Sequence, residues 1–182
     1  MNMIRFPGYL TLIRPMNAHE RQASTPVHIS RHRRYERPTH DEQGEFGVAS
    51  RHALLLRLDT IGELAPAAPL SFLMVKVIGL GDFDRECGEV GSDEVLRRVA
   101  STILGVTRAT DMVGRMSGTG FGIVLQGTGC VGAGAVAARL AHHLAKAIQA
   151  LPALRIEVAA ATGTGINAET LPLAALDSFS EN

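Results

Sequence analysis

Apolar residues recur at helical spacing in three stretches of the chain. The first begins at Ser50, a residue type that favours the N-cap position, and its apolar face continues to Ile61. The second begins at Ser92, which precedes an acidic first turn and an apolar face that continues to Leu104. The third is the alanine-rich stretch 134–150. The pattern therefore predicts three helices, two of them with a serine N-cap.

Apolar runs of strand length lie between these helices. They cover residues 71–78, 111–116, 122–125 and 155–162. The second and third runs flank a short glycine-containing stretch, which is typical of a β-hairpin. Because strands alternate with helices along the chain, we expect an α/β fold in which helices pack on a sheet.

The first 42 residues lack this regularity. They are rich in proline, histidine, arginine and serine, and they include the basic run Arg31, His32, Arg33 and Arg34. Such a composition predicts a flexible or partner-dependent N-terminal segment over residues 1–42. The basic run either binds an anionic partner or is a solvated tail, and the sequence alone favours the tail.

Composition and charge exclude several classes of protein. The 182 residues carry 18 Lys and Arg against 18 Asp and Glu, and this formal charge of +0 predicts neither a nucleic-acid nor a membrane partner. The two cysteines, Cys87 and Cys130, stand far apart and match no disulfide framework or zinc site. No run of membrane-spanning length and no secretory signal is present, so we expect a cytoplasmic protein.

The tip of the predicted hairpin resembles a known signature. Its residues are Ser117, Gly118, Thr119, Gly120 and Phe121. They resemble the Gly-Gly-Asp/Glu-Glu-Phe tip of GGDEF (diguanylate cyclase) domains, with the second glycine and the phenylalanine kept. Both acidic positions of that signature are replaced.

A second motif extends the resemblance. Family members carry Asn-x-x-x-Gly-His-x-x-Gly-Asp, and this chain has Asp84, Gly88, Glu89, Ser92 and Asp93 at the same spacing. The likeness covers about residues 43–177. It implies a nucleotidyl-cyclase-like mixed sheet with flanking helices and a signature hairpin. It also implies a degenerate GGDEF domain over residues 43–182, without the usual C-terminal helix that grips the GTP phosphates.

The altered positions bear on catalysis. Joining two GTP molecules requires divalent ions, which carboxylates must hold at one place. In the family these carboxylates come from the first strand and the hairpin tip, and this chain has Lys76, Thr119 and Gly120 there. The resemblance therefore predicts no catalytic residues, no metal, no cofactor and no cyclase activity. Lys76 is either an ordinary lysine or a point charge for a phosphate.

A regulatory motif of the family is kept. Arg108 and Asp111 form an Arg-x-x-Asp motif, and five residues separate Asp111 from Ser117, as in the family's inhibitory site for cyclic di-GMP. Arg139, on the following helix, corresponds to a second arginine that family members often present to the dimeric ligand from a partner domain. The resemblance therefore implies a non-catalytic cyclic di-GMP receptor that signals to a protein partner, and it leaves a ligand-linked homodimer open.

Other interpretations stay open at this point. Asp84 and Asp93 correspond to guanine-reading residues of the family, although Asp93 is also explained as a first-turn residue behind Ser92. A nucleotide-independent protein-interaction module is the main alternative, and it predicts that Arg108 is buried in a salt bridge with Asp111. A residual nucleotide-processing enzyme is the other.

Overall fold

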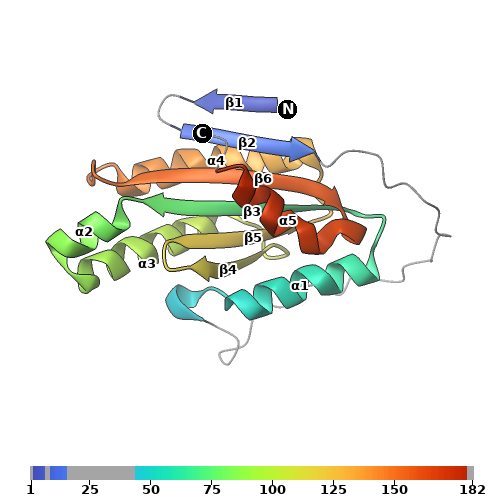
Figure 1. Cartoon of the computed structure of the whole chain (residues 1–182), viewed down its shortest axis with the longest axis horizontal. Coiled ribbons are helices and arrows are strands. Elements are labelled where there is room, and N and C mark those ends of the chain that lie inside the picture. Colours follow the sequence, from blue (N-terminus) through green and yellow to red (C-terminus); the bar gives the residue numbers. More distant parts are fainter. Residues whose placement is uncertain (1, 7–8, 16–43, 180–182) are drawn as a thin grey trace.

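A six-stranded sheet organises the computed structural model, which describes residues 2–6, 9–15 and 44–179 (Figure 1). The strand order is β1-β2-β6-β3-β5-β4. Neighbouring strands are antiparallel except for β2 and β6, which run parallel, so the sheet is mixed as expected. The strands are β1 (Asn2–Phe6), β2 (Tyr9–Pro15), β3 (Pro69–Ile78), β4 (Met112–Ser117), β5 (Gly120–Gln126) and β6 (Arg155–Thr164).

Helices cover both faces of this sheet. They are η2 (Glu45–Gly47), α1 (Arg51–Leu64), α2 (Leu80–Cys87), α3 (Glu89–Val106), α4 (Cys130–Ile148), η3 (Gly165–Thr170) and α5 (Leu171–Asp177). Successive side chains of β3 point to opposite faces, so Leu73 and Val75 share a core with α3 and α4. Phe72 and Met74 share the other core with α1 and α5. Figure 1 shows α5 in front of the sheet and α4 behind it.

Of the two predicted helix starts, one is confirmed and the other is wrong. The prediction for Ser50 is confirmed, because its side chain accepts a hydrogen bond from the Ala53 N–H at 3.2 Å. The prediction that Ser92 is an N-cap is wrong. Gly88, with φ 76°, ends α2 and is itself the residue before α3, so the helix begins at Glu89 and Ser92 is buried inside it. A glycine reaches this backbone conformation at little cost, and this favours the earlier start.

The predicted hairpin is confirmed as β4 and β5, joined by Gly118 and Thr119. Gly114 and Gly122 lie opposite each other in the hairpin and leave room for α1. A Cβ atom added at Gly114 would lie 2.9 Å from the Cβ of Leu54, and one at Gly122 would lie 2.6 Å from the ring of Phe72. The absence of side chains at these two positions thus lets α1 and β3 pack closely against the hairpin.

The N-terminal segment contains two strands that the sequence pattern does not predict. The strands β1 and β2 form an antiparallel pair, and β2 pairs with β6 from Thr11 opposite Val158 to Pro15 opposite Thr162. The basic run of residues 31–34 lies outside the described residues, and the division of the chain at residue 42 stays a prediction. Within the described part, no helix is long and apolar enough to cross a membrane.

Candidate functional site

The Arg-x-x-Asp motif forms a closed turn between α3 and β4. Arg108 donates its backbone N–H to Oδ2 of Asp111 at 2.9 Å, and the Asp111 N–H donates to the Arg108 carbonyl at 3.0 Å. The Arg108 side chain is exposed, and its guanidinium forms no salt bridge with Asp111 among the described ion pairs. The carboxylate therefore fixes the backbone of the turn and leaves the guanidinium accessible.

Asp111 is half-buried at this turn, and its environment acts on its charge in both directions. Burial raises the pKa of Asp111 above its ordinary value, because desolvation disfavours the carboxylate. The Arg108 N–H and the positive charges of Arg108 and Arg139 oppose this effect on the pKa. Both arginines thus lie close enough to Asp111 for their charges to act on it.

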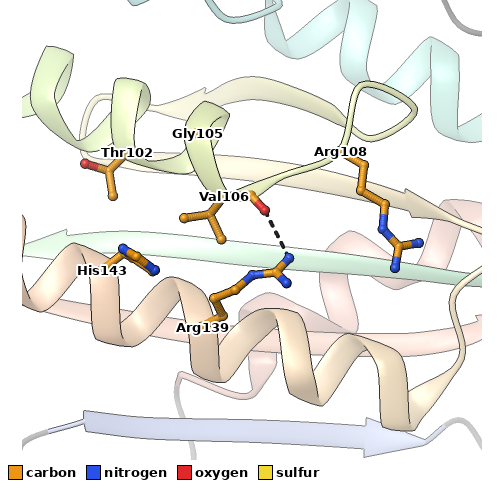
Figure 2. A pocket seen from close by; sticks show the side chains of 6 residues that line it. All are labelled: Thr102, Gly105, Val106, Arg108, Arg139 and His143. Atoms are coloured by element: carbon orange, nitrogen blue, oxygen red, sulfur yellow. Dashed lines mark hydrogen bonds between the residues drawn. The ribbon is translucent and has the colours of Figure 1, made fainter.

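Arg139 reaches the same region from α4. Its Nη2 donates a hydrogen bond to the Val106 carbonyl at 3.0 Å, at the last residue of α3 (Figure 2). A cation at this place also interacts favourably with the negative end of the α3 dipole. The hydrogen bond holds the guanidinium beside the loop that carries Arg108.

A hollow of about 590 Å³ lies between α3 and α4. This volume is within the range of small-molecule sites. Figure 2 shows Arg108 reaching down from the loop, while Arg139 and His143 rise from α4. The hollow is lined by Thr102, Gly105, Val106, Arg108, Arg139 and His143. Two guanidiniums are among its lining groups, so it is suited to an anion.

The structure places Arg108 and Arg139 of the same chain at one hollow. Asp111 is not among the residues that line the hollow. Its carboxylate accepts the hydrogen bond from the Arg108 N–H and so stabilises the turn beside the hollow. His143 lines the hollow without having been predicted. Its spacing of four residues from Arg139 on one helix is the signal that could have identified it, because such residues lie on the same face.

The hairpin tip lies beside the first-strand position that carries Lys76. Lys76 is paired with Gly120 across β3 and β5, and the Val77 N–H donates to the Thr119 carbonyl at 2.8 Å. The Lys76 ammonium lies 5.9 Å from the centre of the Phe179 ring. The two elements of the resemblance are thus neighbours in the sheet, with a cation where the family has a carboxylate.

A divalent ion does not fit these residues. Among the described residues, no three or more His, Cys, Asp or Glu side chains are grouped so that they could hold a metal ion. At the hairpin, the ammonium of Lys76 would repel a cation, and Gly120 offers no side-chain ligand. The side chains at the hairpin tip therefore do not offer the carboxylate ligands that the resemblance implies for catalytically active relatives.

Arg115, on β4, contacts the tip of the hairpin. Its Nη2 donates to the Gly118 carbonyl at 2.6 Å, and its guanidinium lies 5.1 Å from the Phe46 ring centre and 4.9 Å from that of Phe121. Burial lowers the pKa of Arg115, while the charges of Glu45 and Asp93 oppose that shift. The sequence pattern does not predict this role, which depends on residues from three separate elements.

The two aspartates proposed to contact guanine are both exposed. Asp84 lies on α2, and Asp93 lies on α3 near enough to Arg115 for its charge to affect the pKa of that arginine. Since α3 begins at Glu89, Asp93 is in the second turn, and its interpretation as a first-turn residue is wrong. Whether these carboxylates contact a base stays a prediction.

Comparison with known proteins gives the family. A sequence model described as "Diguanylate cyclase, GGDEF domain" matches residues 46–171, which is more than half of the chain. The chain belongs to the GGDEF domain family. No curated protein matches it.

Several solved GGDEF structures share the fold. The chain is 18% identical to the GGDEF domain of DgcB from Caulobacter crescentus, solved with c-di-GMP, with a TM-score of 0.63 over 87% of this chain and 94% of that one. For the FimX GGDEF domain from Pseudomonas aeruginosa, the identity is 15% and the TM-score 0.64, over 77% and 94%. For the diguanylate cyclase SiaD from Pseudomonas aeruginosa, solved with its activator SiaC, the values are 20% and 0.63, over 78% of this chain and 60% of SiaD. These TM-scores show that the chain shares the GGDEF fold. At such low identities they do not show its activity, which must be inferred from its own residues.

Proposed function

We propose that this GGDEF domain is a non-catalytic receptor for cyclic di-GMP, which it binds at Arg108, Asp111 and Arg139. One observation carries the proposal: the guanidiniums of Arg108 and Arg139 come from different elements and line one hollow of about 590 Å³. The salt bridge with Asp111 that would withdraw Arg108 from a ligand is not among the ion pairs of the described residues. The feature that would favour a pure interaction module is therefore missing there.

The chemistry of the site suits a cyclic dinucleotide. A guanidinium can donate two parallel hydrogen bonds to a phosphate or to N7 and O6 of guanine. Asp111 uses Oδ2 for the Arg108 N–H, and its second oxygen can accept from the N1–H and amino group of guanine. Arg139 supplies a second positive charge at the same hollow, and a cyclic dinucleotide carries two phosphates.

Two structures of similar proteins support this proposal, because each was solved with a bound molecule. The GGDEF domain of DgcB was solved in complex with c-di-GMP, and SiaD was solved with an activator protein. We extend both features to this chain: cyclic di-GMP as its ligand, and an unidentified protein as the partner that receives the signal. A homodimer linked by the ligand, and a location in the cytoplasm, belong to the same proposal.

The absence of cyclase activity is the second part of the proposal. Lys76, Thr119 and Gly120 replace the carboxylates that would hold the ions of a phosphoryl transfer. The test is incubation of the chain with GTP and magnesium or manganese, followed by chromatography. We expect no cyclic di-GMP. Clear turnover would support the residual-enzyme alternative and contradict this part of the proposal.

Calorimetric titration with cyclic di-GMP tests the receptor directly. Charge-assisted hydrogen bonds contribute about 1.5–3 kcal/mol each, so Arg108→Ala should weaken binding by roughly tenfold or more. Arg155→Ala, at an exposed arginine on β6, is the matched control and should leave the affinity unchanged. If wild type releases no heat, or if Arg108→Ala binds equally well while folded, the protein-interaction module becomes the better interpretation.

A further inference from the structure

His143 lines the same hollow as Arg108 and Arg139, but the proposed binding of cyclic di-GMP gives it no part. It follows Arg139 by four residues on α4. Residues at this spacing lie on one face of a helix, with Cβ atoms about 5–6 Å apart. Figure 2 shows both side chains rising from α4 towards α3. The imidazole therefore lies beside a guanidinium that faces the proposed ligand.

The ring of His143 is available to a ligand. Its side chain is exposed, and its described ring contact is an edge-to-face one with His142, at 5.6 Å between the ring centres. Within the described part of the chain, no hydrogen bond or ion pair of His143 is found. Thr102, across the hollow, differs in this respect because its hydroxyl donates to the Arg98 carbonyl at 2.8 Å. A ligand would therefore displace no protein partner from the ring nitrogens of His143.

The charged groups on the helices around His143 are mostly positive. Arg139 and Lys146 lie about one turn before and after it on α4, and Arg98 lies one turn before Thr102 on α3. None of the six described residues that line the hollow is acidic.

The loop beside the hollow adds Arg108 and one carboxylate, that of Asp111. This carboxylate already accepts the Arg108 N–H and lies outside the lining of the hollow. Asp111 also titrates in acid, so a test of His143 must hold Asp111 constant.

The strands packed against α4 add no described carboxylate on its side of the sheet. These strands are β6, β3 and β2. In β6, Val158 faces the core shared with α4, so its neighbour Glu157 lies on the opposite face. The ionisable residues of β2 are Tyr9 and Arg14. A proton gained by His143 would therefore add a positive charge to a hollow that already has two.

We infer that His143 is a further ligand-binding residue of this site, and that its protonated ring binds a phosphate of cyclic di-GMP beside Arg139. The inference rests on the proposed binding of cyclic di-GMP at the hollow. Imidazole gains its proton between about pH 8 and pH 5, whereas a phosphodiester stays ionised throughout that range. Both nitrogens of a protonated ring donate hydrogen bonds. Because the coupling of two bound species is reciprocal, ligand and proton each favour the binding of the other.

Calorimetric titration of the full chain with cyclic di-GMP at two pH values tests this inference. We expect wild type to bind at least about threefold more tightly at about pH 5.5 than at about pH 8, since binding takes up a proton. His143→Ala should lose most of this difference. His142→Ala is the matched control, at an exposed histidine outside the lining of the hollow, and should keep the difference. Asp111 is present in all three proteins, so its own titration cancels in the comparison.

A permanent charge at this position gives an independent test. His143→Lys should bind with similar affinity at both pH values, and more tightly than wild type at about pH 8, because its ammonium needs no proton from the solution in this range. Circular dichroism shows whether each variant is folded.

The outcomes separate this inference from the receptor proposal. If wild type binds cyclic di-GMP equally well at both pH values, the assignment of His143 is wrong and the receptor proposal stands. The same holds if folded His143→Ala or His143→Lys keeps the pH dependence, or if His142→Ala loses it. If wild type binds no cyclic di-GMP at either pH, the receptor proposal fails, and the assignment of His143 fails with it.

Discussion

The backbone N–H of Arg108 donates to the Asp111 carboxylate, and the backbone N–H of Asp111 donates back to the Arg108 carbonyl. This reciprocal pair fixes the loop from which the Arg108 guanidinium extends. The structure thus gives Asp111 a positioning role, in addition to the ligand contact proposed for it. The two roles can be separated by substitution.

Asp111→Ala removes the acceptor of the Arg108 N–H, so it should lower the free energy of unfolding by about 1 kcal/mol. Asp111→Asn keeps an oxygen that can accept the same hydrogen bond, and its unfolding free energy should stay near that of wild type. Urea denaturation of both variants measures the difference. Equal losses in the two variants would show that the hydrogen bond does not support the turn.

The pKa of Asp111 predicts a pH dependence of known sign. Burial raises this pKa above its ordinary value of 3.8, so the folded protein holds the proton more tightly than the unfolded chain does. The resulting stabilisation is fully present below the unfolded pKa and is lost as the pH rises through the folded pKa. The unfolding free energy of wild type, minus that of Asp111→Asn, should therefore fall with rising pH across the acid range. Denaturation curves at several pH values test this, and a rise would contradict it.

Arg108→Lys distinguishes recognition by a planar group from recognition by charge alone. A lysine ammonium keeps the positive charge, but it cannot donate two parallel hydrogen bonds in the geometry of a guanidinium. We expect the variant to regain little of the affinity for cyclic di-GMP that Arg108→Ala loses. Calorimetry with the same ligand measures it, and full recovery of the affinity would indicate a simple phosphate contact.

A ligand-linked homodimer predicts a change in mass. If two chains share an intercalated pair of ligand molecules, cyclic di-GMP should raise the apparent mass in light scattering. Arg139→Ala should reduce that rise. Its thermal unfolding should change little, because Arg139 is exposed and the hydrogen bond that it loses, to the Val106 carbonyl, is also at the surface. An unchanged mass with saturating ligand would indicate a monomeric complex.

The hairpin offers a matched pair of glycine substitutions. Gly122→Ala places a methyl group 2.6 Å from the Phe72 ring and 2.7 Å from Leu54, and overpacking of this kind costs about 1–3 kcal/mol. Gly118→Ala meets no atom within 4 Å and should change stability by less than about 0.5 kcal/mol. Chemical denaturation of the two variants compares them. Similar effects would mean that the sheet and α1 shift apart more easily than their packing suggests.

Local sequence patterns predicted much of this fold. The apolar spacing and Ser50 identified α1, and the glycine-rich tip identified the hairpin, because each depends on residues that are close in sequence. The start of α3 was not predicted, since a strong N-cap residue at Ser92 lies inside a helix that begins after Gly88. The earlier start is favoured by the backbone conformation of Gly88 between α2 and α3, which apolar periodicity does not reveal.

In the candidate site too, some residues could be predicted from the sequence and others could not. Arg108, Asp111 and Arg139 were predicted through resemblance to a motif, and the structure brings the two arginines to one hollow. The contribution of His143 depends on how α4 lies against α3. The contacts of the Arg115 guanidinium with the Phe46 and Phe121 rings join segments more than 70 residues apart, and such an arrangement leaves no local signal.

The parallel pairing of β2 with β6 determines the order in which the sheet can be completed. Thr11 lies opposite Val158, so the two partners are separated by 147 residues of chain. At a synthesis rate of about 5–20 residues per second, β2 waits roughly 7–30 s for the strand that it joins. Until then β2 lacks its native neighbour, and the edge of β3 that β6 covers in the finished sheet is open to other strands. The newly synthesised chain therefore passes through an interval in which mispairing competes with correct assembly.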